Sequence, residues 1–481
     1  MKNLDVYLYD DLVAQLTFTN SGLVELHYVS DTSPVLSVSL PNDGSKLKRM
    51  AIRNFFDNLL PDDEKIREEW AARFSQRRKI SPKNPFALLE HMGHDAPGAL
   101  VILPEGKTLD ARRGELEYLA QGDIAARLSL ISSHAGSVAK FADINSFNGR
   151  FSLSGAQPKI ALTSFDNGVN FYSSSGLFPS THILKPTGGM FRDSDLIEHL
   201  THKTALFSSL NTTKTDFRDF NGQTCLVSNR YDRNFIEKEK AIRRLHQEDM
   251  CQAFGISSQK KYESDGGTSV KNILLLLKNR ASEKDVFSFI EYQAFSWAVA
   301  NTDGHAKNFS ILHRKNGEIE LAPLYDICSF LPYEPSKGSR DPVFGRAYYS
   351  PKLAMKIGER CMTEKIGENN WRKLAESTQL DPDKVLSHVV GVLDRLPEAT
   401  IQAVKEAKTY SDSELLDVYE DKILSSVEKC RNSIFSNVSA APAAHTSNCS
   451  IYSKPLTNPE SIARGMGEKC AKQPDTHTRS N

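Results

Sequence analysis

The chain has 481 residues, which is too long for one compact core, so we expect two or three domains. Apolar residues make up 39% and charged residues 25%, the proportions of an ordinary globular protein. Lys and Arg total 60 and Asp and Glu total 60, so the net charge gives no argument for wrapping nucleic acid. The seven cysteines are scattered without a CxxC pair, which disfavours a disulfide framework and a zinc site.

The sequence predicts neither a signal peptide nor a membrane span. An acid, Asp5, stands where a signal peptide would be apolar, and no stretch approaches the roughly 18 uninterrupted apolar residues of a spanning helix. We therefore expect a cytosolic protein that has no membrane partner.

Residues 1–105 predict an α+β module. Alternating apolar residues between Asp5 and Val29, with a turn at Asn20-Ser21-Gly22, indicate short antiparallel strands. Two helices and one further strand are then predicted at residues 50–60, 63–79 and 99–103. The residues of this module give no internal evidence of function. Residues 106–148 are polar and predict a helical connector.

A different domain, residues 149–436, begins with alternation around a Gly-containing turn at residues 151–162, which predicts a β-hairpin. Such a hairpin can present backbone N–H groups to phosphate, although an ordinary hairpin is the alternative. Lys185 ends a short apolar strand, where kinases keep the Lys that pairs with phosphates; a solvated strand end is the alternative. Glu198, in a predicted helix, is a candidate partner for Lys185, and residues 227–233 could meet adenine through backbone groups.

The segment from Asn301 to Ser310 carries the strongest functional signal. Asp303 and Asn308 are five positions apart, as are the base and the metal-binding amide of a kinase catalytic loop. Asp326 follows a short apolar run, in the place of the magnesium-binding Asp of kinases. An Asp-Gly pair alone is usually a turn, but these residues in this order favour phosphoryl transfer.

The part order is hairpin, strand Lys, hinge, helices, Asp/Asn loop and metal Asp, which is typical of a two-lobed kinase. We therefore predict an α+β, two-lobed protein-kinase-like fold with an N-terminal α+β module and an all-helical C-terminal lobe. Helices of that lobe are expected at residues 286–300, 371–396 and 414–434. Residues 437–481 are rich in small and polar residues and predict a disordered tail.

Residues 1–435 resemble the HipA family of bacterial Ser/Thr kinases, the toxin components of toxin–antitoxin pairs. The resemblance is carried by several strings in family order, which are residues 54–61, 154–159, 181–185, 247–252, 261–267, 302–310 and 325–327.

The resemblance implies a role for each matched position. Asp303 would be the catalytic base, Asn308 and Asp326 would hold Mg²⁺, and Ser152 would be an autophosphorylation site. The hinge would span Asn229 to Tyr231. Contacts with ATP would come from Ser154, Gly155, Ala156, Gln157, Lys159, Lys185, Asn229, Arg230, Tyr231, His305, Lys307, Asn308, Tyr325 and Asp326.

The resemblance also implies partners. A helix-turn-helix antitoxin of HipB type would hold the kinase inactive, and DNA would be contacted only indirectly through it. The protein substrate would be a translation component, chiefly an aminoacyl-tRNA synthetase. A degenerate kinase that serves as an antitoxin-binding co-repressor module and a small-molecule kinase are the alternatives. Two departures from the family pattern are Asn229, where an acid is common, and the string Glu198-His199-Leu200, which leaves the partner of Lys185 open.

Overall fold

The computed structural model describes residues 2–19, 21, 23–75, 79–109, 114–133, 159–174, 178–187, 191–236, 241–314, 317–333 and 351–435. The chain divides into one unit of residues Met1–Arg431 and a second of Asn432–Asn481. The predicted hairpin turn at residues 151–158, which includes Ser152, and the predicted tail at 437–481 lie outside the described residues.

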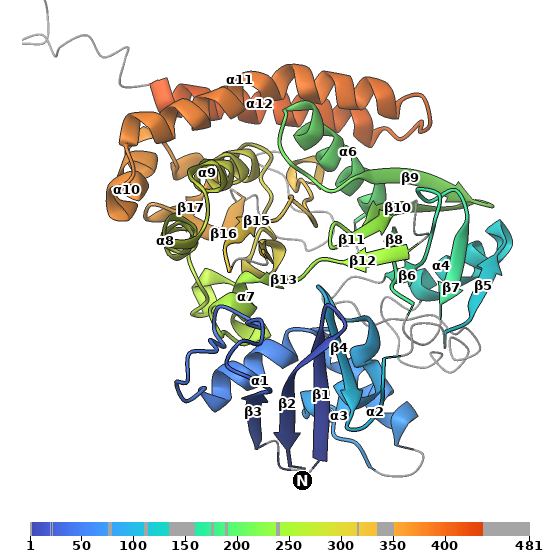
Figure 1. Ribbon diagram of the computed structural model, residues 1–481. Coiled ribbons are helices and arrows are strands. Elements are labelled where there is room, and N and C mark those ends of the chain that lie inside the picture. Colours follow the sequence, from blue (N-terminus) through green and yellow to red (C-terminus); the bar gives the residue numbers. More distant parts are fainter. Residues whose placement is uncertain are drawn as a thin grey trace, which may run out of the picture. The chain divides into compact units, whose positions relative to one another are not determined.

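The N-terminal module is a four-stranded antiparallel sheet in the order β3-β2-β1-β4, covered by helices, as the apolar alternation predicts. Phe55 and Phe56 of the first helix and Leu4 and Leu16 of the sheet are fully buried in its core. The elements, coloured blue in Figure 1, are β1 (Lys2–Leu8), β2 (Asp11–Phe18), β3 (Val24–Tyr28), α1 (Arg49–Asp57), α2 (Glu64–Phe74), α3 (Pro85–Met92), η1 (Gly93–Asp95) and β4 (Leu100–Pro104).

The next lobe is built on an antiparallel sheet in the order β6-β8-β10-β9, with α4 and α6 packed against it. Residues 106–148 are not purely helical, because β5 forms and pairs with β7. The elements are β5 (Leu116–Leu119), α4 (Gln121–Ser133), β6 (Ile160–Leu162), β7 (Phe171–Ser174), β8 (His182–Pro186), α6 (Ser194–Phe207), β9 (Thr215–Phe220), β10 (Gln223–Asn229), β11 (Arg233–Ile236) and β12 (Ala241–Arg244).

The C-terminal lobe is mainly helical, with α9, α10 and α11 packed together (Figure 1). Its helices are α7 (Met250–Ala253), α8 (Val270–Arg280), α9 (Glu283–Ala298), α10 (Glu368–Thr378), α11 (Pro382–Ala407) and α12 (Leu415–Phe435), with short 3₁₀ turns η3 (Ser258–Lys260), η4 (Glu263–Asp265), η5 (Ala306–Asn308), η6 (Leu331–Tyr333) and η7 (Thr363–Lys365).

The expectation of an all-helical lobe needs one correction. Two small sheets also form there, from β13 (Gln247–Asp249), β14 (Ser310–His313), β15 (Ile319–Leu321), β16 (Lys352–Ile357) and β17 (Arg360–Met362). Four of these strands have three or four residues, too few for period-two alternation to reveal them in sequence. The six-residue β16 does alternate, with Leu353, Met355 and Ile357 buried, and was not predicted. The kinase-like fold class itself is confirmed.

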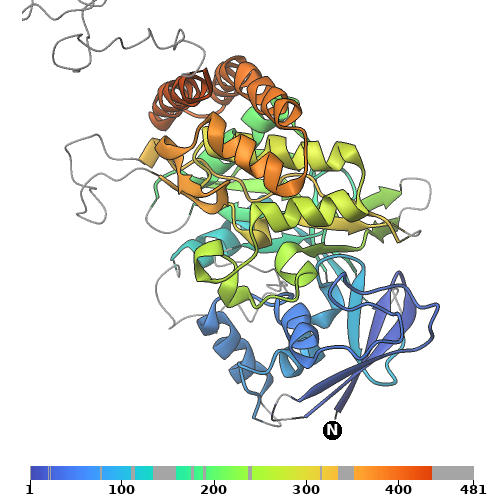
Figure 2. The same ribbon diagram turned by 90° about the vertical axis from the view of Figure 1, so that its left-hand side faces the viewer.

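The N-terminal module contacts the C-terminal lobe through α1 and α7, which lie next to each other in Figure 1 and can be followed from a second direction in Figure 2. The side chain of Asn54 donates a hydrogen bond to the Gly255 carbonyl at 2.8 Å, and that of Asn58 donates to the Ile256 carbonyl at 2.9 Å. Within the described part of the chain, no helix is long and apolar enough to cross a membrane.

Candidate active site

A cavity of about 490 Å³ is lined by residues from the N-terminal module and from both lobes. Asn58 and Asp62 come from the module, Lys185 and Glu198 from β8 and α6, and the catalytic-loop segment from the C-terminal lobe. The cavity is large enough for a nucleotide-sized ligand.

Lys185 is the centre of a buried ion cluster at the wall of this cavity. Its ammonium donates to Glu198 Oε1 at 2.7 Å and to Asp326 Oδ1 at 2.5 Å. Lys185 is the next-to-last residue of β8, and Glu198 faces it from the first turns of α6. The sequence left the partner of Lys185 open, and the structure identifies it as Glu198.

Charge and burial oppose each other in this cluster. Burial alone would lower the pKa of Lys185, but the two carboxylates raise it above its ordinary value. Burial alone would raise the pKa of Asp326, but the charges of Lys185 and Lys159 outweigh it and hold that pKa well below its usual range. Burial raises the pKa of Glu198 above normal. Asp326 is therefore ionised at neutral pH, as a metal-binding carboxylate must be.

The predicted catalytic loop, residues 301–310, follows α9. Asp303 is the exposed member, with 65% of its side chain open to solvent, and its Oδ1 accepts a hydrogen bond from the Tyr262 hydroxyl at 2.5 Å. The side-chain amide nitrogen of Asn308 donates to the Asp303 carbonyl at 2.8 Å, which joins the two ends of the loop. The amide oxygen of Asn308, the atom that a cation needs, is not used in that bond.

The residues present fit a nucleotide with Mg²⁺. Asn58 Oδ1, His305 Nδ1 and both side-chain polar atoms of Asn301 are buried at the cavity and lack a hydrogen-bond partner among the described residues. Buried polar groups are normally satisfied, so these atoms indicate a polar ligand. The described residues hold no cluster of three or more His, Cys, Asp or Glu that could bind a metal alone. One carboxylate and one amide suffice for Mg²⁺, because it keeps waters and binds substrate phosphates.

Three of the predicted ATP contacts near the loop are engaged inside the protein. The Lys307 ammonium donates to Asp62 Oδ1 at 2.8 Å, and the Tyr325 hydroxyl donates to the Lys307 carbonyl at 2.7 Å. His305 lies with its Nε2 3.8 Å from Asp303 Oδ1, and burial lowers its pKa. Lys307 and Tyr325 therefore hold the loop together in this structure. Both also line the cavity, and their contacts with ATP stay a prediction.

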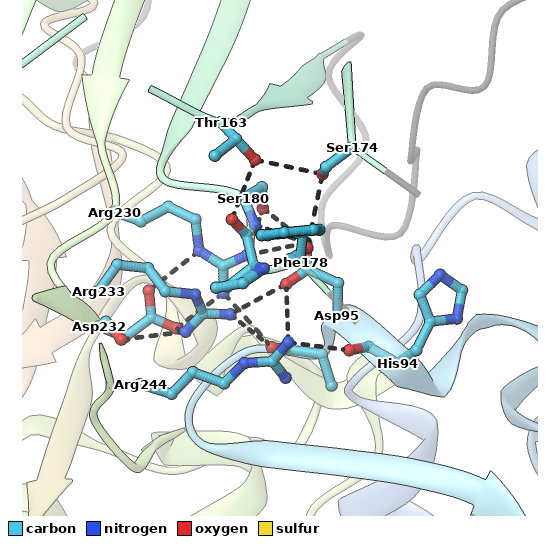
Figure 3. Close-up of polar contacts among 12 residues, drawn as sticks. His94, Asp95, Thr163, Ser174, Phe178, Ser180, Arg230, Asp232, Arg233 and Arg244 are labelled. Atoms are coloured by element: carbon cyan, nitrogen blue, oxygen red, sulfur yellow. Dashed lines mark hydrogen bonds and ion pairs between the residues drawn. The ribbon is translucent and has the colours of Figure 1, made fainter. Parts of the chain in front are cut away.

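The predicted hinge is only partly available to a ligand. Asn229 ends β10, and Tyr231 packs its ring 5.3 Å from that of Tyr325. The Arg230 guanidinium bonds Asp232 and the Ser180 hydroxyl, and its backbone N–H donates to the Thr181 carbonyl at 2.8 Å. Figure 3 shows Arg230 pointing into this closed cluster. The side chain and the N–H of Arg230 are therefore engaged inside the protein; Arg230 also lines the cavity, and its contact with ATP stays a prediction.

Of the remaining predicted residues, one lines the cavity and the others lie outside the described part of the chain. Lys159 lies beside β6 and lines the cavity, where burial and the charge of Lys185 lower its pKa. The predicted ATP contacts Ser154, Gly155, Ala156 and Gln157 and the predicted autophosphorylation site Ser152 lie outside the described residues.

Two residues that contact the predicted loop were not predicted from the sequence: Asp62, which lines the cavity, and Tyr262. Asp62 of the N-terminal module binds both Lys307 and Lys261, and Tyr262 bonds the carboxylate of Asp303. Tyr262 stands in the string 261–267 that carries the family resemblance, and Asp62 directly follows the string 54–61. No local spacing connects either residue with the loop.

The chain matches two domain families that cover most of its length. The HipA N-terminal domain matches residues 4–103, and the HipA-like C-terminal domain matches residues 151–400. A third match, to a family of unknown function, covers residues 439–475, where the sequence predicts a disordered tail.

Similar proteins cover nearly the whole chain. Y4mE of Sinorhizobium fredii, named provisionally as a kinase, is 30% identical over 447 residues, which are 90% of this chain and 99% of Y4mE. The serine/threonine-protein kinase toxin HipA of Shewanella oneidensis is 26% identical over 444 residues, 89% of this chain and 95% of that protein.

A solved structure has the same fold. It is the Shewanella oneidensis HipA–HipB complex with operator DNA, which matches with a TM-score of 0.74 and 24% identity over 90% of this chain and 99% of the matched chain. The family matches, the relatives and the shared fold agree with the geometry of the cavity, and the chain belongs to the HipA family of serine/threonine kinase toxins.

Proposed function

We propose that this chain is an ATP- and Mg²⁺-dependent protein serine/threonine kinase and the toxin of a toxin–antitoxin pair. The observation that carries the proposal is the convergence of Lys185, Glu198 and Asp326 in one cavity with the loop of Asp303 and Asn308. A phosphate-binding lysine, its carboxylate partner, a metal carboxylate and a base are the parts that phosphoryl transfer needs.

In this mechanism Lys185 binds the phosphates of ATP and is held in place by Glu198. The oxygen of the acceptor hydroxyl forms a bond to the γ-phosphorus of ATP while Asp303 accepts the proton of that hydroxyl. The bond between the γ-phosphorus and the β–γ bridging oxygen breaks, and ADP leaves. Asn308 and Asp326 would hold Mg²⁺, which neutralises charge on the phosphates when bound. The hydroxyl of Tyr262 occupies the place on Asp303 Oδ1 that an acceptor hydroxyl would take, so the acceptor must displace it.

The backbone of Asp326 supports its assignment. Its φ is +55°, in the left-handed region that non-glycine residues rarely adopt. Such conformations concentrate at functional sites, where the surroundings maintain them. Here Lys185 maintains the position of the side chain.

We further propose that the acceptor is a serine or threonine of a translation component such as an aminoacyl-tRNA synthetase. The partner would be an antitoxin of HipB type, with DNA contacted through it. The basis is the similarity to a HipA and to a HipA that was solved with HipB and operator DNA. Ser152, which lies outside the described residues, would be an autophosphorylation site.

The test is to incubate the purified chain with γ-labelled ATP, Mg²⁺ and a bacterial lysate, and to identify the labelled residues by mass spectrometry. The proposal predicts label on a Ser or Thr of a translation protein and on Ser152, with none when Mg²⁺ is chelated. Label that appears equally without Mg²⁺, or only on small molecules, would refute it.

A further inference from the structure

The loop between α1 and α2 brings one carboxylate of the N-terminal module into the cavity. Asp62 Oδ1 accepts from the Lys307 ammonium at 2.8 Å, and Oδ2 accepts from the Lys261 ammonium at 3.2 Å. The side chain of Asp62 is 11% exposed and that of Lys307 is 4% exposed. The Asn58 carbonyl accepts a second bond from Lys307 at 3.3 Å. Two groups of this module therefore hold one lysine of the catalytic loop.

The loop that carries Asp62 is fixed from its own side. Arg67 of α2 donates from Nε to the Pro61 carbonyl at 2.5 Å and from its guanidinium to Asp57 Oδ1 at 2.7 Å. Asp63 caps α2, because its side chain accepts from the backbone N–H groups of the first turn. Asp62 is therefore held between two anchored neighbours, and it is not a flexible surface acid.

The module is also fixed to the lobe that it reaches. Besides the bonds of Asn54 and Asn58, the buried Glu248 accepts from the Val38 N–H at 2.8 Å and from the Ser37 hydroxyl at 2.5 Å. Gln252 donates from its side chain to the Phe55 carbonyl at 3.2 Å. These contacts place Asp62 at Lys307 as a consequence of how the module packs.

Lys307 is the point at which the catalytic loop can be held. It lies in η5, a three-residue turn that is too short to be rigid by itself. Its neighbour Asn308 bonds the Asp303 carbonyl, so the peptide at 307–308 sets the distance between the base and the metal-binding amide. Fixing the Lys307 side chain therefore fixes both functional groups.

We propose that Asp62 is a positioning residue for phosphoryl transfer, supplied to the active site by the N-terminal module. The inference rests on the proposed kinase function. It gives the module a catalytic task, although its sequence alone indicated none. The neutral, isosteric Asp62→Asn should lower kcat by about 10- to 100-fold, because small displacements of catalytic groups cost rate steeply. The KM for ATP should change by less than about threefold, because Lys185 and Glu198 are untouched.

Asp63→Asn is the matched control. It removes an adjacent carboxylate that lies outside the cavity lining and caps α2, and asparagine can serve as a cap as well. Its kcat should equal that of the wild type. Asp62→Glu restores the charge and should recover part of the lost kcat. If Asp62 only stabilised the fold, kcat per folded molecule would be unchanged in every variant.

A second readout does not depend on activity. Acetylation of Lys307 by a small anhydride reagent, followed by mass spectrometry of the full chain, should be at least about tenfold faster in Asp62→Asn than in the wild type. A folded Asp62→Asn with wild-type kcat and equal labelling of Lys307 would overturn the inference. A wild-type chain that transfers no phosphate at all would overturn the proposed function instead, whereas equal labelling overturns the positioning contact alone.

Discussion

Two of the buried ion networks in the described part of the chain differ in how far they are exposed to the cavity. In the first, Lys185 binds Glu198 and Asp326, and the Asp326 side chain remains 33% exposed at the cavity. In the second, three arginines, Arg230, Arg233 and Arg244, surround Asp95, whose side chain is 1% exposed (Figure 3).

The second network is closed. Asp232 pairs with Arg230 and Arg233 at 2.8 Å each, and Arg233 donates further bonds to the carbonyls of Ala96 and Gly98. Asp95 belongs to η1 of the N-terminal module, so this cluster ties the module to the strand that leads to the hinge. Both networks contain buried charge and reach the cavity lining, but the Asp326 side chain is 33% exposed there, whereas that of Asp232 is 6% exposed. Burial of charge alone therefore does not identify a catalytic site.

The largest effect is expected at Asp303, the proposed base at the cavity. Asp303→Asn should lower phosphoryl transfer by about 10²–10⁴-fold, because a positioned general base contributes that much. The melting temperature should not fall, since the side chain is mostly exposed. A labelled-ATP assay on folded protein decides, and near-wild-type transfer would show that Asp303 is not the base.

The closed network should respond in the opposite way. Asp95→Asn leaves three arginines without their shared charge, so the free energy of unfolding should fall by about 3 kcal/mol. Transfer per folded molecule should remain near that of the wild type, because Asp95 does not line the cavity. Urea unfolding and a transfer assay at low temperature measure the two quantities. Intact stability with lost activity would reverse the assignment of the two networks.

Within the cavity, the two proposed magnesium ligands should be unequal. Asp326→Ala should raise the Mg²⁺ concentration needed for half-maximal transfer more than Asn308→Ala does, by about tenfold against a few-fold, because a carboxylate binds Mg²⁺ more strongly than an amide. A Mg²⁺ titration of transfer at fixed ATP makes the comparison. Equal shifts in both variants would refute the ranking.

The smallest effect concerns buried histidines outside both networks. Burial lowers the pKa of His199 to about 4 and that of His202 and His246 to about 3, whereas an unfolded histidine titrates near 6.5. Between these values the unfolded chain binds more protons, so stability is present above pH ~6.5 and is lost as the pH falls. Each histidine contributes at most ~1.4 kcal/mol per pH unit.

His202→Gln should therefore flatten the loss of unfolding free energy between pH 6.5 and 5. Urea unfolding of wild type and variant at pH 7.5, 6.5 and 5.5 measures that slope. Asp326 and Asp232 of the two networks should not contribute to this slope, because their pKa values lie below this pH range. An identical slope in the two proteins would contradict the assignment.

The sequence predicted those parts of the site that depend on local spacing. Asp303, Asn308 and Asp326 stand in one short stretch, and Lys185 ends an alternating strand, so the sequence predicts all four as site residues. All four line the cavity, and their chemical roles stay predictions. The strands and the first two helices of the N-terminal module followed from apolar periodicity in the same way, whereas α3 was not predicted.

The parts that could not be predicted depend on partners distant in sequence. Lys307 binds Asp62 from 245 residues away, and Arg230 reaches Asp95 of the N-terminal module. A sequence shows that a residue is charged, but it does not show which opposite charge lies beside it. The family resemblance predicts that Lys307 and Arg230 contact ATP, and the structure adds that each also holds the module and the kinase lobes together.

The most direct test of the account is a calorimetric titration of the full chain with a non-hydrolysable ATP analogue, with and without Mg²⁺, for the wild type, Asp326→Asn and Asp95→Asn. We expect Mg²⁺-dependent binding to the wild type and to Asp95→Asn, and binding at least about tenfold weaker to Asp326→Asn. Equal weakening in both variants, or binding that ignores Mg²⁺, would contradict the claim that the Lys185 cluster alone is the nucleotide site.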